Sequence, residues 1–467
     1  MFTIDFKKPI HIHFLGIGGI SMSALAELLM KKGFTVSGSD RTESPLTDRL
    51  ASLGAAVYYS QVASNITSDI DLVVYTAAIH PDNEEYAAAA TAGIPMMDRA
   101  ELLGQLSATY SISIGVSGTH GKTTTTGMLA TILTEAALDP TVSIGAIMPA
   151  LGGNLRIGES ERFLFEACEY TNSFLKFHPT DALILNIDAD HLDFFKDLDD
   201  IRHSFRLFAG KLPADGHLVI NGEIPNLSSF LEGLECSVDT YGLLPEGVAP
   251  SESPYRYTAA AVTYDNLGCA SYDLYRDGVF VDRISLSVVG IHNVCNSLAA
   301  IAEAYLRDIP VETIRHALLS FTGTERRFEK KGIHNGVTVV DDYAHHPTEI
   351  AATLKAALAC PHNRLFVVFQ PHTFSRTIKL RNEFVKALSV ADVIVLADIY
   401  AAREADEGII SSNDLAEDLK KLGREAYFFP SFDEIVKFLN KNCANGDLLI
   451  TMGAGNVVNV GVSLLQS

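Results

Sequence analysis

The chain has 467 residues, of which 47% are hydrophobic, and it carries a formal net charge of -21 at pH 7. This length is too great for one ordinary core, and with this apolar content it excludes a disordered chain and predicts two or three domains of roughly 100 to 200 residues each. Acidic side chains outnumber basic ones by 57 to 36, which argues against a nucleic-acid partner because the phosphate backbone would be repelled.

Three segments start in the same way, with a short apolar run, a Gly- or His-rich turn and an amphipathic helix, an order typical of α/β folds. We predict an α/β protein with a Rossmann-like domain over residues 1–107, a central domain with a phosphate-loop-type parallel sheet over 108–322, and a Rossmann-like C-terminal domain over 323–467. Short alternating runs between residues 236 and 290 predict an antiparallel β insert in the central domain.

The first domain opens with a glycine turn between a strand and a helix, made by Gly16, Gly18, Gly19, Ile20 and Ser21. The second strand ends at Asp40, where Rossmann folds place an acid that binds ribose. Ser21 replaces the third glycine of the dinucleotide pattern, so the motif alone is weak. Two interpretations stay open: the turn binds a nucleotide diphosphate, or it is a tight structural turn with a solvated Asp40.

The central domain opens with a phosphate loop, because residues 111–133 read as a buried strand, the letters GTHGKTT and an apolar-periodic helix. Lys122 would bridge the β- and γ-phosphates of a nucleotide, and Thr123 offers a hydroxyl to Mg²⁺. Val116 stands where the strict GxxxxGK[ST] pattern needs glycine, so this is a shortened variant, and a glycine-rich turn with an incidental lysine is the alternative. The predicted ATP-binding residues of this loop are Gly118, Thr119, His120, Gly121, Lys122, Thr123 and Thr124.

Acidic side chains follow two later strands of the central domain. Glu166 and Glu169 come after an apolar run at 163–165, and the segment 186–193, which contains His191, follows another run. Carboxylates with one imidazole suit a Mg²⁺ ion that is held partly by substrate phosphates. The alternatives are a buried structural role for the histidine, and capping or solvation for the three aspartates of this segment, Asp188, Asp190 and Asp193.

The six cysteines show no CxxC spacing, which favours a reducing compartment over a zinc site or a disulfide framework. The N-terminus has no apolar signal-peptide core, and no apolar run reaches the roughly 18 residues of a membrane span. A cytoplasmic protein with no membrane partner is therefore expected.

Five motifs occur in an order that resembles the Mur ligases: GTHGKTTT at 118–125, NIDADHLD at 186–193, GIHNVCNSLAA at 290–300, RRF at 326–328 and DDYAHHPTE at 341–349. The resemblance covers essentially the whole length and continues through residues 369–376 and 453–456. It implies three α/β domains and ATP- and Mg²⁺-dependent ligation of L-alanine to the lactyl carboxylate of UDP-N-acetylmuramate, through an acyl phosphate, with release of ADP and phosphate in peptidoglycan precursor synthesis. A monomer or a homodimer is expected.

The resemblance also implies roles for individual residues. The turn from Gly16 to Ser21 would bind the UDP diphosphate, with Asp40 near the uridine. The ATP and metal contacts beyond the phosphate loop would be His292 and Asn293 at the adenine, Arg327 at the γ-phosphate, Asp342 at the ribose, and His191 with Glu169, or Glu166 as the alternative, at the metal. The residues facing the lactyl carboxylate and the incoming alanine would be Tyr343, His345, His372 and Arg376.

The catalytic set implied in this way is Lys122, Arg327, His191 and His345. His345 or a nearby carboxylate would take the proton of the alanine amine. Since ATP contacts lie on both sides of residue 322, the C-terminal domain is expected to close over ATP and to bind the amino acid. Structural alternatives remain for four further side chains: helix capping by His292 and Asn293, a solvated or structural Arg326, and a turn-shaping role for His346.

Three departures from the family pattern stand out. Glu169 is followed by Tyr-Thr-Asn-Ser where many members have ESDAS, Thr373 replaces an arginine, and residues 398–406, which include Arg403, differ from a shorter acidic-proline loop. The last departure is expected to alter the fit of the amino acid. Rival functions are a ligase that joins a peptide to the same sugar nucleotide, an NAD-dependent oxidoreductase built on the Gly16 turn, and a nucleotide-binding regulator without turnover.

Overall fold

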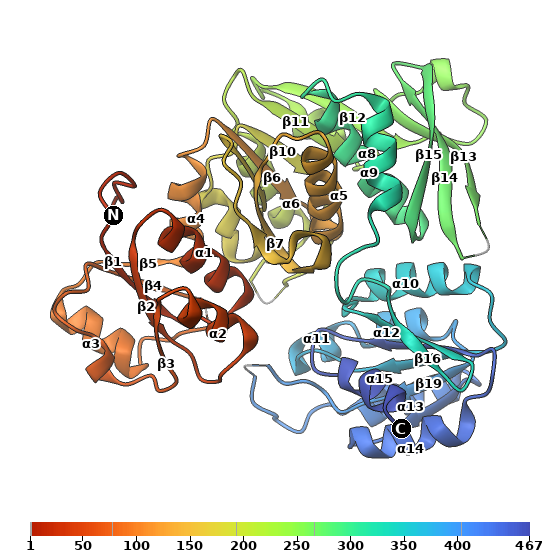
Figure 1. Cartoon of the computed structure of the whole chain (residues 1–467). Helices are drawn as coiled ribbons and strands as arrows, with labels where there is room; N and C mark the ends of the chain where they lie inside the picture. The colour runs from red at the N-terminus through yellow and green to blue at the C-terminus, as the bar shows by residue number, and fades with distance from the viewer. Residues whose placement is uncertain (1, 77, 193, 266, 403) are drawn as a thin grey trace. The chain divides into compact units, whose positions relative to one another are not determined.

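The computed structural model describes residues 2–76, 78–192, 194–265, 267–402 and 404–467, and these residues form three β-sheets with helices on their faces (Figure 1). They divide into two compact units, residues 1–240 with 302–307 and residues 241–301 with 308–467. The predicted α/β class with three sheets is confirmed. In the described part of the chain, no helix is long and apolar enough to cross a membrane.

The N-terminal sheet has five parallel strands in the order β3-β2-β1-β4-β5. Its elements are β1 (His11–Leu15), α1 (Ile20–Lys31), β2 (Thr35–Ser39), α2 (Pro45–Ser52), β3 (Ala56–Tyr58), β4 (Leu72–Tyr75), α3 (Glu84–Ala92), β5 (Met96–Asp98) and α4 (Arg99–Ser107). Side-chain caps start three of these helices, because Ser44, Asn83 and Asp98 accept hydrogen bonds from the first-turn N–H groups of α2, α3 and α4.

The central sheet has ten strands in the order β15-β14-β13-β12-β11-β10-β6-β9-β7-β8. Its elements up to the unit boundary are β6 (Ile112–Ser117), α5 (Lys122–Glu135), β7 (Thr141–Met148), β8 (Gly153–Arg156), β9 (Arg162–Glu166), β10 (Asp181–Ile184), α6 (Leu198–Ala209), β11 (His217–Asn221), α7 (Leu227–Leu231) and β12 (Ser237–Leu243). The elements that follow are β13 (Tyr257–Tyr264), β14 (Cys269–Arg276), β15 (Val279–Val289), α8 (Ile291–Tyr305) and α9 (Val311–Ser320).

The C-terminal sheet has the order β16-β17-β21-β18-β19-β20, and β16 is its antiparallel edge. Its strands are β16 (Glu329–His334), β17 (Val337–Asp342), β18 (Leu365–Phe369), β19 (Val393–Leu396), β20 (Glu425–Phe428) and β21 (Leu448–Met452). Its helices are α10 (Pro347–Ala359), α11 (Phe374–Lys379), α12 (Arg381–Leu388), α13 (Ser412–Lys421), α14 (Phe432–Asn442) and α15 (Val458–Leu465). The helices α10, α12 and α13 bury one face of the sheet, and α14 and α15 bury the other.

Two details of the central sheet differ from the prediction. The sheet is not parallel throughout, because β7 and β8 form an antiparallel hairpin at one edge. The insert is antiparallel through β13, β14 and β15 as predicted, but β12 and β13 pair in parallel. Both pairings involve strands whose apolar pattern carries no information on direction. The predicted domain boundaries at 107 and 322 stay predictions.

Candidate active site

The loop between β6 and α5 has the backbone of a phosphate-binding turn. Gly118 has a φ of +146°, and a Cβ at this position would lie 2.9 Å from the Cβ of Leu185. Gly121 has a φ of +87° and is the N-cap of α5. The N–H groups of the first turn of α5 have no acceptor inside the helix, and together with the positive end of the helix dipole they form an anion site. Gly118 is therefore required by conformation and by space, and Gly121 by conformation.

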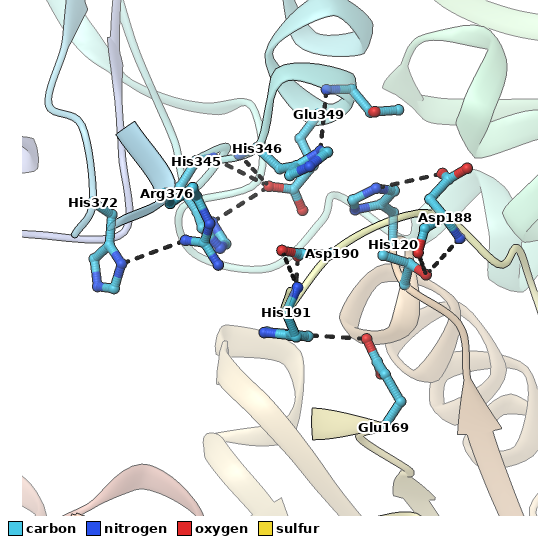
Figure 2. Close-up of polar contacts among 12 residues, drawn as sticks. His120, Glu169, Asp188, Asp190, His191, His345, His346, Glu349, His372 and Arg376 are labelled. Carbon is cyan, nitrogen blue, oxygen red and sulfur yellow. Dashed lines mark hydrogen bonds and ion pairs between the residues drawn. The ribbon is translucent and has the colours of Figure 1, made fainter. Parts of the chain in front are cut away.

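The segment after β10 holds this loop from one side. His120 N donates to Asn186 Oδ1 at 2.8 Å, and Asn186 Nδ2 donates back to the carbonyl of His120 at 2.9 Å. Asp188 N donates to Thr119 Oγ1 at 2.9 Å, and His120 Nε2 lies 3.5 Å from Asp188 Oδ2 (Figure 2). The shape of the phosphate loop is thus set by the same segment that carries His191.

Lys122 lies across the loop beside a buried carboxylate. Its Nζ donates to the carbonyls of Gly118 and Thr119 and lies 2.9 Å from Glu169 Oε2. Glu169 is only 1% exposed. Burial by itself would lower the pKa of Lys122, but Glu169, together with smaller contributions from Cys168 and Glu166, outweighs burial and raises the pKa. The ammonium is therefore charged at neutral pH, as a group that binds phosphate must be.

His191 lies on the other side of Glu169. Its Nε2 is 3.8 Å from Glu169 Oε1 and 3.9 Å from Asp190 Oδ2 (Figure 2). Its ring packs on that of Tyr170 with centroids 4.5 Å apart. The backbone of His191 has a φ of +53°, which is unfavourable for a residue with a side chain. Strain of this kind concentrates at functional sites, where the surroundings hold it in place.

The two glutamates after β9 have different partners. Glu166 Oε1 accepts a hydrogen bond from Gly145 N at 2.6 Å, and a Cβ on Gly145 would come within 2.9 Å of Glu166 Oε2. Glu169 contacts Lys122 and His191 instead. Of the two alternatives left open by the sequence, the geometry favours Glu169 as the carboxylate beside the phosphate loop.

The residues near the loop fit a phosphate-bound Mg²⁺ ion rather than a metal enclosed by protein. Among the residues that the structure describes, no three His, Cys, Asp or Glu side chains gather to hold a metal ion. A nucleotide-bound Mg²⁺ needs only one or two protein oxygens, because phosphates and water supply the rest. Thr123, which is buried in the first turn of α5, and Glu169 provide such oxygens. Two of the residues discussed from the sequence, Asp193 and Arg403, lie outside the described residues.

The N-terminal glycine turn uses its own N–H groups internally. Gly16 N and Ile17 N donate to the carbonyl of Ser39 at 2.8 and 2.9 Å, and Gly18 N donates to Asp40 Oδ2 at 2.8 Å. A Cβ on Gly18 would lie 2.9 Å from the same carboxylate oxygen. The predicted diphosphate donors at the two glycines are therefore already occupied within the protein.

The donors left for an anion lie at the start of α1, where sequence reasoning missed a cation. The first-turn N–H groups of a helix, here those of Ile20 and Ser21, have no acceptor inside it. Arg99 Nη1 donates to Ser21 Oγ at 3.0 Å, and Asn154 of β8 donates to the carbonyl of Ile20. Arg99 is 78 positions away from Ser21 in the chain, so no local pattern signals this neighbour. A guanidinium beside a helix N-terminus favours phosphate.

In the second unit, Asp342 ends β17 with both carboxylate oxygens hydrogen-bonded. Oδ1 accepts from Ala344 N at 2.7 Å, and Oδ2 accepts from Phe328 N at 2.8 Å. Burial raises the pKa of Asp342 to about 6, although the Arg327 guanidinium and the two N–H groups oppose the shift. Above that pH the carboxylate is ionised and keeps lone pairs for a further donor, such as a ribose hydroxyl.

The two neighbouring arginines differ in what they contact. Arg326 donates to Asp341 Oδ2 at 2.9 Å and to two carbonyls of the turn after β21, which is the structural role held as an alternative. The side chain of Arg327 is 30% exposed, packs over the ring of Tyr343 at 5.3 Å, and lies 3.8 Å from Glu349 Oε1. Of the two, Arg327 therefore has the more accessible guanidinium.

Glu349 organises the start of α10, although sequence reasoning did not single it out. Its Oε2 accepts hydrogen bonds from the backbone N–H groups of His345 and His346, at 3.1 and 3.3 Å, and lies 3.3 Å from His345 Nδ1 (Figure 2). His346 Nδ1 accepts from Thr348 N and caps the helix. The turn-shaping alternative for His346 therefore fits the structure. A glutamate at this helix position is the sequence sign of a capping box.

The four residues predicted to face the substrates come together in the second unit. The ring of His345 meets those of Tyr343 and His372 edge-on, with centroids 5.4 and 5.8 Å apart. His372 Nδ1 lies 3.5 Å from Arg376 Nη1 (Figure 2), and the ring of His372 stacks on that of Tyr400. Two imidazoles, a phenol and a guanidinium gathered in this way can bind a carboxylate and accept a proton.

The two predicted adenine contacts differ in exposure. Asn293 is buried, its Nδ2 donates to the carbonyl of Val289 at 2.8 Å, and its Oδ1 accepts from Asn296 at 2.9 Å. These bonds stabilise the start of α8, so Asn293 fits the alternative of a helix-capping residue. His292 is exposed at the same helix start. Of the pair, His292 is the better placed to meet a base.

Departures from the family pattern fall on unusual backbone. Thr171 and Asn172, which follow Glu169, have φ values of +54° and +58°, and Thr373 has a φ of +68°. Ser204 Oγ donates to Asn172 Oδ1, and Thr373 N donates to the carbonyl of Tyr400. These contacts hold conformations that residues with side chains rarely adopt.

Comparison with known proteins covers nearly the whole chain. Three protein-family models match: the Mur ligase family catalytic domain over residues 11–111, the Mur ligase middle domain over 116–304 and the Mur ligase glutamate ligase domain over 326–455. Their order along the chain is that of the three sheets.

Individual relatives agree with these matches. The chain is 57% identical, over 100% of both sequences, to a UDP-N-acetylmuramate–L-alanine ligase of Lachnoclostridium phytofermentans. A solved UDP-N-acetylmuramate–alanine ligase of Thermotoga maritima is 29% identical with a TM-score of 0.82, and a murein peptide ligase of Psychrobacter arcticus is 25% identical with a TM-score of 0.72; each comparison covers 98% of both chains. The chain therefore belongs to the Mur ligase family.

Proposed function

We propose that this protein joins L-alanine to the lactyl carboxylate of UDP-N-acetylmuramate at the expense of ATP, in the synthesis of peptidoglycan precursors. The observation that carries the proposal is the 57% identity over the full length of a relative with that activity in its name. The chemistry of the two units agrees with the proposal, because one carries a charged lysine on a phosphate loop and the other carries a group of two histidines, a tyrosine and an arginine.

ATP supplies the phosphoryl group that turns the lactyl carboxylate into an acyl phosphate, which an amine can attack. Lys122 and Arg327 would stabilise negative charge on the transferred group, and Mg²⁺ held by Thr123, Glu169 and His191 would add to that stabilisation. The buried Glu169 keeps Lys122 charged and oriented over the loop carbonyls. In this proposal His292 meets the adenine and Asp342 the ribose.

The sugar nucleotide would be held by the N-terminal unit. Its diphosphate would bind at the start of α1, between the first-turn N–H groups and Arg99, and Asp40 would lie near the uridine. We assign the diphosphate to the helix start because the N–H groups of Gly16 and Gly18 donate to Ser39 and Asp40.

The alanine amine must lose a proton before it attacks. His345 is the proposed base, because Glu349 and the carbonyl of Tyr343 orient its ring through Nδ1. Arg376 would bind the carboxylate of the amino acid, with His372 beside it.

The test is release of ADP and phosphate with UDP-N-acetylmuramate and a panel of amines that contains L-alanine, glycine, L-serine and a murein tripeptide. We expect turnover with alanine to exceed that with the tripeptide, and product mass to correspond to one added alanine. Preference for the tripeptide would identify the sister activity, which the likeness to the murein peptide ligase keeps as the second candidate. Nucleotide binding without turnover on any of the amines would refute both ligase functions.

A further inference from the structure

A buried polar network underlies the nucleotide end of the N-terminal sheet, and the residues assigned above do not account for it. At its centre is Glu85 of α3, which is fully buried. One carboxylate oxygen, Oε2, accepts a hydrogen bond from Ser39 Oγ, and the other, Oε1, accepts one from Asn65 Nδ2 at 2.5 Å. The ring of His13, also fully buried, approaches Oε1 to 3.6 Å.

The network continues from His13 to the surface. His13 Nδ1 and His11 Nε2 both lie 2.8 Å from Ser37 Oγ, and His11 Nδ1 lies 2.9 Å from the exposed Asp69. These side chains come from alternate positions of β1 and β2, so they line one face of the sheet. A buried carboxylate with its histidine is expensive to desolvate, and apolar residues of similar volume would often give equal stability. Stability alone therefore does not explain why the network is there.

The network meets the proposed sugar-nucleotide site at Ser39. The carbonyl of Ser39 accepts the N–H groups of Gly16 and Ile17, and the next residue, Asp40, accepts that of Gly18. The side chain of Ser39 thus holds Glu85 while its main chain holds the glycine turn. Through this one residue, the position of a buried carboxylate determines the shape of the turn that precedes α1.

Glu85 also fixes a second segment. Asn65, whose amide donates to Glu85 Oε1, donates from the same nitrogen to the carbonyl of Ser60 at 2.6 Å. Residues 59–65 follow β3, the strand whose Tyr58 carbonyl accepts the N–H of Asp40. Two segments on either side of Asp40 are therefore held by the two oxygens of one side chain.

We propose that Glu85 is a positioning residue for UDP-N-acetylmuramate: it presets the glycine turn, Asp40 and the 59–65 segment for the uridine diphosphate. The proposal rests on the proposed function, because it takes the N-terminal site to bind the sugar nucleotide. Presetting avoids the cost of ordering these segments when the ligand binds, so it acts on affinity for this substrate and not on the chemical step.

The informative variant is Glu85→Gln, which keeps the shape and removes one acceptor. The carboxylate accepts from two donors, Ser39 and Asn65, whereas an amide has one oxygen, so glutamine could accept from Asn65 but would reverse the bond with Ser39, whose hydroxyl would then have to accept and would lose its own acceptor. We expect the KM for UDP-N-acetylmuramate to rise about 10-fold, while kcat and the KM for ATP change less than twofold. The matched control is Glu84→Gln, the neighbouring glutamate on the same helix, which is exposed and should leave all three parameters unchanged.

Ser39→Ala and Asn65→Ala test the path. Each should raise the KM for UDP-N-acetylmuramate. The double variant Ser39→Ala with Glu85→Gln should raise this KM by less than the product of the two single effects, because both substitutions act on the same Ser39–Glu85 hydrogen bond. Thermal unfolding of every variant is measured in parallel. A purely structural Glu85 predicts a lower melting temperature with all Michaelis constants unchanged, and this result, or equal increases for every substrate, overturns the proposal.

Failure of this proposal is distinguishable from failure of the proposed function. Titration calorimetry with UDP alone gives the affinity of wild type and variants without turnover. If wild type made no product but Glu85→Gln weakened UDP binding, the ligase assignment would fail and the positioning role would stand. If Glu85→Gln bound UDP as well as wild type did, the positioning role would be wrong.

Discussion

The two glycine turns of this chain look alike in sequence but are held in different ways. Each lies between a buried parallel strand and a helix, and positive φ occurs at one glycine of the first turn, Gly16, and at two of the second, Gly118 and Gly121. In the N-terminal turn, the neighbouring strand β2 takes up the turn's N–H groups through Ser39 and Asp40. In the central loop, the segment after β10 holds the loop through Asn186 and Asp188, and Lys122 crosses it.

The difference shows why a glycine pattern alone does not locate an anion. The N-terminal turn has no lysine and donates the N–H groups of Gly16 and Gly18 within the protein, so the proposed diphosphate site moves to the helix start, beside a distant cation, Arg99. A turn with a lysine needs a counter-charge, and Glu169 provides it from inside the protein. In the proposed function, the same strand–turn–helix unit would serve a diphosphate in one sheet and, with an added lysine and carboxylate, the phosphoryl-transfer end of ATP in the next.

The largest expected effect comes from removing the lysine that distinguishes the two turns. Lys122→Ala should lower kcat for ADP release by about 10³-fold, because it removes a cation from the transferred phosphoryl group and deprives the buried Glu169 of its lysine partner. Lys8→Ala, at a side chain that is 84% exposed, is the control and should be silent. A Lys122→Ala enzyme working at full speed would remove the basis of the comparison.

The next effect separates the two carboxylates after β9. Glu169→Gln should lower kcat by about 10²-fold and raise the Mg²⁺ concentration needed for half-maximal rate. The reason is that it removes the charge that pairs with Lys122 and weakens the proposed binding of the metal. Glu166→Gln should cost less, about 10-fold or under, since Glu166 is bonded to the backbone of Gly145. The measurement is a Mg²⁺ titration of initial rates, and the reverse ranking would assign the metal to Glu166.

A third, smaller effect tests whether the shape of the N-terminal turn determines the affinity for the sugar nucleotide. Gly18→Ala places a methyl 2.9 Å from both Asp40 Oδ2 and Thr47 Cγ2, so we expect the KM for UDP-N-acetylmuramate to rise about 10-fold, close to 1.4 kcal/mol. Gly19→Ala is the matched control, because its nearest atom would lie 3.5 Å away and its φ of -62° suits any residue. Equal effects at the two positions would show that the turn is not shaped by Asp40.

The smallest effect concerns β10, the strand that precedes the segment holding the phosphate loop. Arg307, in the turn after α8, binds Asp181, the first residue of β10, together with the fully buried Glu303 of α8. Burial, with the nearby Asp181 charge, raises the pKa of Glu303 from 4.5 to about 8, although Arg307 opposes the shift. Between about pH 4.5 and 8, Glu303 is therefore protonated in the folded state but ionised in the unfolded chain. The contribution of this group to stability is fully present below about pH 4.5 and is lost as pH rises through that window.

Glu303→Gln cannot ionise and should abolish this loss. We expect the variant to match wild type in thermal unfolding near pH 4.5 and to be more stable by about 1 kcal/mol at pH 9. Melting curves across this range provide the check, and Glu312→Gln in the first turn of α9 is a control on a neighbouring helix. A wild-type advantage at pH 9 would mean that Glu303 is ionised and paired.

Much of the fold could be predicted because the apolar patterns are strong. The strands β6, β17, β18, β19 and β21 are short buried runs bounded by turn residues, and such runs identify parallel strands by composition. The β7–β8 hairpin and the parallel pairing of β12 with β13 could not be predicted, because strand direction depends on connections that a periodicity does not encode.

In the candidate site too, residues within local motifs could be predicted and residues that act over a long sequence distance could not. Lys122 and the residues of 341–349 were found because their motifs carry chemistry at fixed spacing. Arg99 and Glu85 were missed, because each acts on a turn dozens of positions away and has no local signature. Glu349 lay inside a recognised motif, but its several hydrogen bonds appear only once α10 has formed.

The bond pair between Asn186 and His120 has a consequence for inhibition and resistance. The segment that holds the phosphate loop also carries His191, so the distance from the loop to this histidine is set by the backbone of one strand end. An inhibitor that contacts both the phosphate loop and His191 would therefore bind two groups at a fixed distance from each other. Resistance substitutions could not change this distance by small steps, because sliding β10 by one residue would turn every side chain of the strand to the opposite face.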